Sequence, residues 1–215
     1  MEGTDPVNKK LAAALSGGAV LVVALTGCTG SGSGSSGAKG PDPKMVAWAK
    51  SVCQPLPAQQ AKISGAYDAL SKVAKDGPPK DVQQTDSQAF QDLADGFKAR
   101  AATLDGAGAP PGVEGGAQKQ QDAVKKLTAL SAAYADLKKR VDGLDTKDQT
   151  KFASGLSDLS DRMKVVLTQY DGVITALKNL EKGDVNEAVA KQAGCTKTSG
   201  SSSASSSASP SSANG

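Results

Sequence analysis

Apolar residues recur every three or four positions along most of the chain between residues 43 and 197. This spacing places them on one face of an α-helix, so it predicts amphipathic helices. The four long stripes cover residues 57–76, 81–104, 124–141 and 152–180. Clusters of glycine and proline separate the first three stripes, and Gly143 ends the third. No segment alternates polar and apolar residues with a period of two, so we expect no strand.

Two shorter helices flank the long ones. The first has a one-sided apolar stripe ahead of Pro55 that consists of Met45, Trp48 and Val52. The second begins at Asp184, whose carboxylate is placed to cap the helix while Glu187 follows three residues later, which is the capping-box arrangement. Gly194 is a suitable end for it.

The four long segments and their short connections predict an all-α fold, an antiparallel up-down helical bundle with four main helices plus short terminal helices. A three-helix arrangement with an irregular first helix is the alternative. Acidic residues precede basic ones by four positions on the outer faces, which is typical of solvated helix surfaces. These pairs are Asp122–Lys126, Asp136–Arg140 and Asp158–Arg162.

The N-terminal residues 1–27 have the layout of a signal peptide. Lys9 and Lys10 precede an apolar run of 15 residues, Leu11–Leu25. A helix needs about 20 apolar residues to span a bilayer, so this run favours a cleavable segment. Two acidic residues stand before Val7, where a basic region is expected, which suggests that translation begins at Val7 instead of Met1.

Leu25-Thr26-Gly27-Cys28 resembles the bacterial lipobox, in which small residues precede a cysteine. The resemblance implies cleavage after Gly27 and attachment of diacylglycerol to Cys28. The alternatives are a transmembrane anchor or a chance cysteine behind an ordinary secretory signal. Lipidation would tether the protein to the extracellular face of the cell membrane.

The mature chain would consist of one domain between two segments that cannot bury a core. Residues 28–42 contain the lipidated cysteine and a flexible Gly/Ser tether, which as a random coil spans on the order of 20 Å. Residues 198–215 form a Ser/Ala-rich tail without charged side chains, which predicts disorder. Glycosylation of the tail hydroxyls is a second interpretation. The helical bundle domain is therefore assigned to residues 43–197.

Two cysteines remain once Cys28 carries lipid, and thiols in exported proteins usually pair. An up-down bundle brings the start of its first helix and the end of its fourth to the same end. Cys53 and Cys195 lie in those neighbourhoods, so we predict a disulfide between them. A redox couple is the alternative, but it normally uses a Cys-x-x-Cys spacing that this chain lacks.

The residue inventory excludes several kinds of catalytic site. The chain has no histidine, which removes Ser-His-Asp and Cys-His hydrolases and all His-ligated metal sites. Asp158 and Asp161 share a helix face, yet no second acidic cluster converges on them to bind calcium or to act as an acid/base pair. The glycines of residues 112–116 lack a phosphate-loop pattern. We expect no catalytic residues, no metal and no cofactor.

The charge balance of 25 basic against 22 acidic residues gives no reason to expect a nucleic-acid partner. The lipobox, the Gly/Ser tether and the segment Val46-Ala-Trp-Ala-Lys-Ser-Val-Cys53 together resemble the small secreted lipoproteins of unknown function from actinobacteria, particularly the streptomycete type. The resemblance implies a cell-surface location. We expect a non-catalytic domain that binds an envelope protein or a cell-wall component. The alternative is a carrier of a small apolar ligand or lipid in the bundle core.

Overall fold

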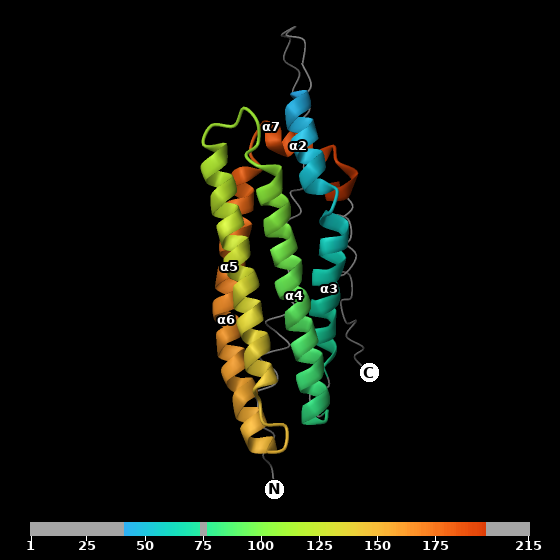
Figure 1. Cartoon of the computed structure of the whole chain (residues 1–215), viewed down its shortest axis with the longest axis vertical. Coiled ribbons are helices and arrows are strands. Elements are labelled where there is room, and N and C mark those ends of the chain that lie inside the picture. The colour runs from blue at the N-terminus through green and yellow to red at the C-terminus, as the bar shows by residue number, and fades with distance from the viewer. Residues whose placement is uncertain (1–40, 74–76, 197–215) are drawn as a thin grey trace, which may run out of the picture.

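The computed structural model describes residues 41–73 and 77–196, and within these ranges it contains helices and no strand. The helices are α2 (Pro43–Cys53), α3 (Leu56–Lys72), α4 (Pro79–Ala107), α5 (Gly116–Asp142), α6 (Gln149–Leu180) and α7 (Asp184–Ala190) (Figure 1). The predicted all-α class is confirmed. The predicted signal peptide, Cys28, nearly all of the tether and the Ser-rich tail lie outside the described residues.

The four long helices α3 to α6 run up and down in alternation, as Figure 1 shows. The closest backbone packing is between α4 and α5, followed by α5 with α6 and α3 with α4. Each helix therefore packs mainly against its neighbours in sequence, and α3 and α6 are the outer members of the series. Because α3 is a regular helix of 17 residues, the four-helix prediction holds and the three-helix alternative is wrong.

The core consists of the apolar stripes seen in the sequence. On α4, the predicted residues Phe90, Leu93, Phe97, Ala101 and Leu104 are all buried. Small residues allow the closest approach of α3 to α4: a Cβ atom at Gly96 would lie 2.6 Å from Ile63 Cγ1. Glycine at this position therefore sets the spacing of the two helices.

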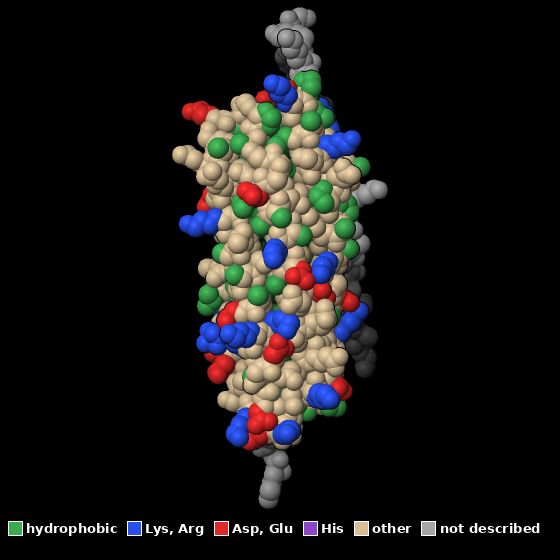
Figure 2. Space-filling view, viewed as in Figure 1, with side chains coloured by type: hydrophobic (Ala, Val, Ile, Leu, Met, Phe, Trp, Pro, Cys, Tyr) green, Lys and Arg blue, Asp and Glu red, His purple; other side chains and the backbone are tan. Residues whose placement is uncertain are grey.

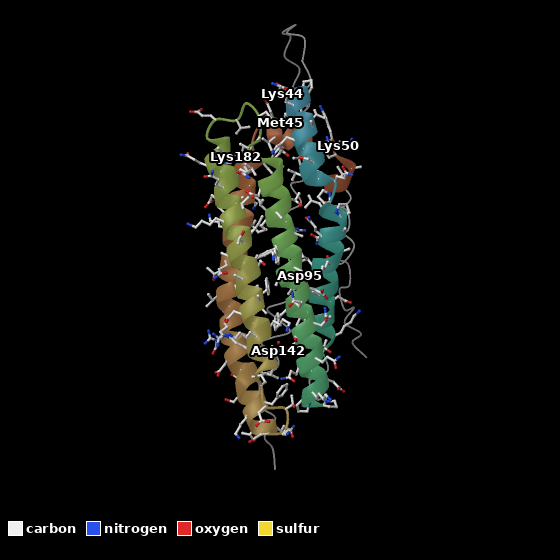
Figure 3. All side chains as sticks on the ribbon, in the orientation of Figure 1. Lys44, Met45, Lys50, Asp95, Asp142 and Lys182 are labelled. Atoms are coloured by element: carbon white, nitrogen blue, oxygen red, sulfur yellow. A yellow bond between two sulfur atoms is a disulfide. The ribbon has the colours of Figure 1, made fainter. Side chains whose placement is uncertain are left out.

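The short helices α2 and α7 pack against each other across one end of the bundle, where Met45 is labelled in Figure 3. The buried Trp48 side chain fixes α2 there, because its indole Nε1 donates a hydrogen bond of 2.8 Å to the carbonyl oxygen of Gly108. The predicted disulfide is present: Cys53 and Cys195 are bonded, with their Cα atoms 5.1 Å apart. Both ends of the domain are thus joined at the same end of the bundle.

The structure corrects the expected cap of the last helix. Gly183, with φ of 62°, is the N-cap residue of α7, and no side chain caps the helix. Asp184 is the first helical residue, so it lies one position too late to serve as the N-cap of a capping box. The capping-box prediction is wrong because a positive φ before the helix requires glycine at that position.

Two helices also end at other residues than the sequence predicted. Helix α3 stops at Lys72, four residues earlier than expected, because Val73 has an extended backbone with ψ of 122°. Helix α7 stops at Ala190, and Gly194 lies within a further helical turn over residues 193–196. A Cβ atom at Gly194 would lie 2.0 Å from the carbonyl oxygen of Cys53. Gly194 is therefore needed for close approach beside the disulfide and does not end a helix.

The exposed faces carry mixed charge. Figure 2 shows basic and acidic side chains interspersed on the visible face. Two of the three predicted ion pairs form, Asp122–Lys126 at 2.8 Å and Asp136–Arg140 at 2.7 Å. Asp158 and Arg162 form no ion pair, and the neighbouring Asp161 pairs with Lys164 at 2.7 Å instead. Such exposed pairs contribute little to stability.

Candidate functional site

The residues singled out from the sequence do not form a reactive site in the described structure. Cys53 and Cys195 are joined in the disulfide. Residues 41–73 and 77–196 contain no group of three His, Cys, Asp or Glu side chains placed to hold a metal ion. No helix within those ranges is long and apolar enough to cross a membrane.

The least expected feature of the interior is a set of polar and aromatic side chains that come from all four long helices. We call it the Arg100 cluster, and its members are Gln60 and Tyr67 of α3, Phe97 and Arg100 of α4, Tyr134 of α5 and Tyr170 of α6. Phe97 and Tyr134 are fully buried, and the other four members are partly buried. The cluster therefore links the outer helices α3 and α6 through the middle of the bundle.

Aromatic contacts organise the cluster around Phe97. The Phe97 ring stacks on Tyr134 with centroids 5.6 Å apart, and Tyr170 meets it edge-on at 6.1 Å. The guanidinium carbon of Arg100 lies 6.0 Å from the same ring centroid. This distance is at the outer limit of a cation–π interaction, which partly compensates for burying the charge.

Two hydrogen bonds complete the cluster. The hydroxyl groups of Tyr67 and Tyr134 are 2.7 Å apart and share one hydrogen bond. Arg100 donates from Nη2 to Oε1 of Gln60. The side chains on α3 thus contact α5 through a phenol and α4 through an amide.

Burial of the cluster shifts the pKa of its ionisable groups toward their neutral forms. Desolvation raises the pKa of Tyr134 to about 12 and raises the pKa values of Tyr67 and Tyr170 as well. Desolvation also lowers the pKa of the Arg100 guanidinium. An arginine nevertheless stays charged at neutral pH, so the cluster holds one cation among three neutral phenols.

Arg100 has no acidic partner among the residues that the structure describes. All ion pairs of the described residues join other basic side chains to acids at the surface. The Nε atom of Arg100 is buried and makes no hydrogen bond, and the same is true of Oε1 of the nearby Gln59. Gln59 belongs to this region because its Nε2 donates to Thr103, one turn from Arg100. A partly buried cation whose buried Nε donor is unused is costly, and such a group calls for an explanation.

A second feature is a groove between α3 and α4 with a volume of about 390 Å³. Its walls are small residues on α3 and mainly polar ones on α4, namely Gly65, Ala66, Ala69, Asp81, Gln84, Thr85, Gln88, Ala89 and Asp92. Lys62 bridges Asp92 at 3.3 Å and Asp95 at 3.4 Å, and Figure 3 labels Asp95 on α4. The groove shares no residue with the Arg100 cluster, and its acids are engaged or exposed. It offers a surface for contact but no reactive group.

Sequence reasoning did not single out the Arg100 cluster, although a signal for it exists. Arg100 stands three residues after Phe97 and four before Leu104, both on the apolar face of α4, so helical spacing places it on the edge of that face. A charged residue at such a position is a candidate for a functional group. No protein-family model, no curated protein and no solved structure matches this chain.

Proposed function

We propose that this protein is a lipoprotein anchored to the extracellular face of the cell membrane, and that its helical domain binds another molecule without catalysing a reaction. The arrangement of the cysteines carries the proposal. The chain has three cysteines, and the disulfide uses Cys53 and Cys195. Cys28 is left, and it directly follows the apolar run and the small residues that resemble a lipobox.

The disulfide supports export, because such bonds persist mainly outside the reducing cytoplasm. An exported protein with an unmodified Cys28 would carry a reactive thiol on its tether, and thioether linkage to lipid removes that liability. Lipid attachment and the disulfide are thus both consistent with a location outside the cytoplasm. The proposal assigns lipid to Cys28 and a structural role to the other two cysteines.

The position of α2 gives the anchored domain an orientation. The expected tether precedes Pro43, at the end of the bundle where α2 and α7 pack together. Helix α6, with 32 residues, extends about 48 Å along the bundle. The connection between α5 and α6 would therefore point away from the membrane, and the α3–α4 groove would face sideways, accessible to an envelope protein or a cell-wall component.

A second candidate function is that of a carrier for a small lipid-like molecule. The observation that favours it is the Arg100 guanidinium in the bundle interior, which lies beside the Phe97 ring and whose buried Nε makes no hydrogen bond. A carrier needs an apolar interior with a polar group that fixes the ligand, and the Arg100 cluster has both.

Metabolic labelling with a clickable fatty acid tests the anchor. We expect the wild-type protein and the Cys53→Ser/Cys195→Ser variant to be labelled, and the Cys28→Ala variant to lose both label and membrane association. A Cys28→Ala protein that keeps its label would contradict the assignment.

Crosslinking on intact cells, followed by identification of the linked molecules, tests the binding role. Partners found with the wild type should disappear when Cys28→Ala releases the domain from the membrane. Native mass spectrometry of protein purified from its own host separates the two binding roles, because a retained small molecule favours the carrier.

A further inference from the structure

Arg100 has no acidic side chain paired with it among residues 41–73 and 77–196. The nearest partly buried acid on the same helix face is Asp86, which precedes Arg100 by 14 residues and so lies about 21 Å away along α4. The acids Asp92 and Asp95 on α4 are engaged with Lys62. The guanidinium therefore has a donor to spare and no acidic partner in the described part of the bundle.

The cluster also contains a second unused donor. When two hydroxyl groups share one hydrogen bond, one donates and the other keeps its own proton free. The bond between Tyr67 and Tyr134 therefore leaves one phenolic proton available beside the guanidinium. A tyrosine hydroxyl is protonated at neutral pH, and burial raises the pKa of both groups further, so that proton is present. An N–H donor of a cation together with an O–H donor suits the oxygen atoms of a carboxylate or a phosphate.

The surroundings are suited to an apolar group next to that anion. The Phe97 ring, which lies beside Arg100, contacts the rings of Tyr134 and Tyr170. Tyr67 of α3 and Tyr170 of α6 both belong to the cluster, and these two outer helices do not share the close backbone packing of helices adjacent in sequence. We expect a small molecule to reach Arg100 between these two helices, because side chains are easier to move than backbone.

We infer that the Arg100 cluster is a binding site for a small amphiphile whose oxyanion group, a carboxylate or a phosphate, pairs with Arg100 while its apolar part lies against the aromatic rings. This inference names a ligand class for the proposed binding domain. It rests on the domain having a binding role and does not depend on lipid at Cys28.

The test measures thermal unfolding of the full-length protein by circular dichroism, in a nonionic detergent and at constant ionic strength. The probes are sodium hexanoate and hexyl phosphate, with sodium acetate, inorganic phosphate and sodium chloride as references. We expect hexanoate or hexyl phosphate to raise the melting temperature saturably and the three references to have little effect. The amphiphile that raises the melting temperature more shows whether the site prefers a carboxylate or a phosphate.

Substitutions tie the effect to the site. Arg100→Gln should weaken binding by at least about tenfold, because it removes a charge-assisted hydrogen bond. Lys98→Gln is the matched control, since Lys98 is an exposed cation on the same helix and its loss should leave binding unchanged. Arg100→Met provides a second variant that should fold well, because an apolar side chain replaces a partly buried charge without an acidic partner among the described residues.

Three results would overturn the inference. They are the absence of saturable stabilisation by either amphiphile, equal stabilisation by acetate or inorganic phosphate, and an undiminished effect in the Arg100 variants. The result of these titrations can be told apart from the test of the lipid anchor, because fatty-acid labelling can succeed or fail independently of amphiphile binding.

Discussion

The disulfide joins the end of α2 to the turn after α7, so breaking it tests how far the ends of the domain depend on a covalent link. Its two cysteines are 142 positions apart in the sequence, so the closed loop contains almost the whole domain. In the chain-entropy model, a bond restricts the unfolded chain more strongly as the loop lengthens. We therefore predict that reduction, or replacement of both cysteines by serine, destabilises the domain markedly.

The magnitude follows from the length of the loop. For a separation of 142 the chain-entropy model gives about 5 kcal/mol, which is an upper value because denatured chains retain some structure. A change of 1 kcal/mol moves the melting temperature of a domain of this size by about 2–4 °C. The full entropic effect thus corresponds to a fall of about 10–20 °C, and half of it to about 5–10 °C.

The assay compares melting curves of the oxidised protein, the reduced protein and the Cys53→Ser/Cys195→Ser variant. Trp48 is the only tryptophan of the chain and is 6% exposed, so its fluorescence reports whether α2 stays docked near the bond. Reductant should have no effect on the double variant, which serves as the control. A fall of less than about 2 °C, or alkylation of both cysteines without prior reduction, would refute the reasoning.

Three other predictions concern single sites. Gly194→Ala should destabilise the domain by about 1–3 kcal/mol in urea unfolding, since its Cβ would lie 2.0 Å from a backbone oxygen. The control Gly172→Ala, in open space on α6, should stabilise the domain by about 0.5–1 kcal/mol. Equal effects of the two substitutions would argue against the close contact at Gly194. Desolvation raises the pKa of Asp86 to about 6 from 3.8, so the folded state binds the extra proton and loses stability as the pH rises from 4 to 7. Asp86→Asn should reduce the fall in unfolding free energy between pH 4 and 7 by up to about 3 kcal/mol. A variant whose unfolding free energy depends on pH as the wild type's does would contradict the argument that Asp86 is desolvated. Replacing Tyr67 or Tyr134 alone by Phe should each cost about 1 kcal/mol, while the double variant should cost less than the sum; strict additivity would mean that their hydrogen bond contributes nothing.

Local sequence was sufficient to predict the helices and their buried faces. Residues such as Phe90, Leu93 and Phe97 recur with the helical period, and a stripe of that kind has to be covered by another element. The cysteine pair was predictable for a different reason, because an up-down topology with four helices brings their two positions to the same end. The least accurate predictions were helix ends and caps, which depend on backbone angles at single residues such as Val73 and Gly183.

The sequence by itself determined the helical segments and the absence of histidine chemistry, since each of these follows from residue identity or from a local period. The partners in the disulfide followed only once these segments were arranged in an up-down topology. The tertiary structure alone decided which polar residues lose contact with water. Arg100 stands at the edge of an apolar stripe, where helical spacing permits either exposure or burial. Its burial depends on where α3 and α6 come to lie, and so does its proximity to Tyr67, Tyr134 and Tyr170 from three other helices. Distances between segments far apart in the chain arise only from packing, because no local pattern specifies how closely two helices approach.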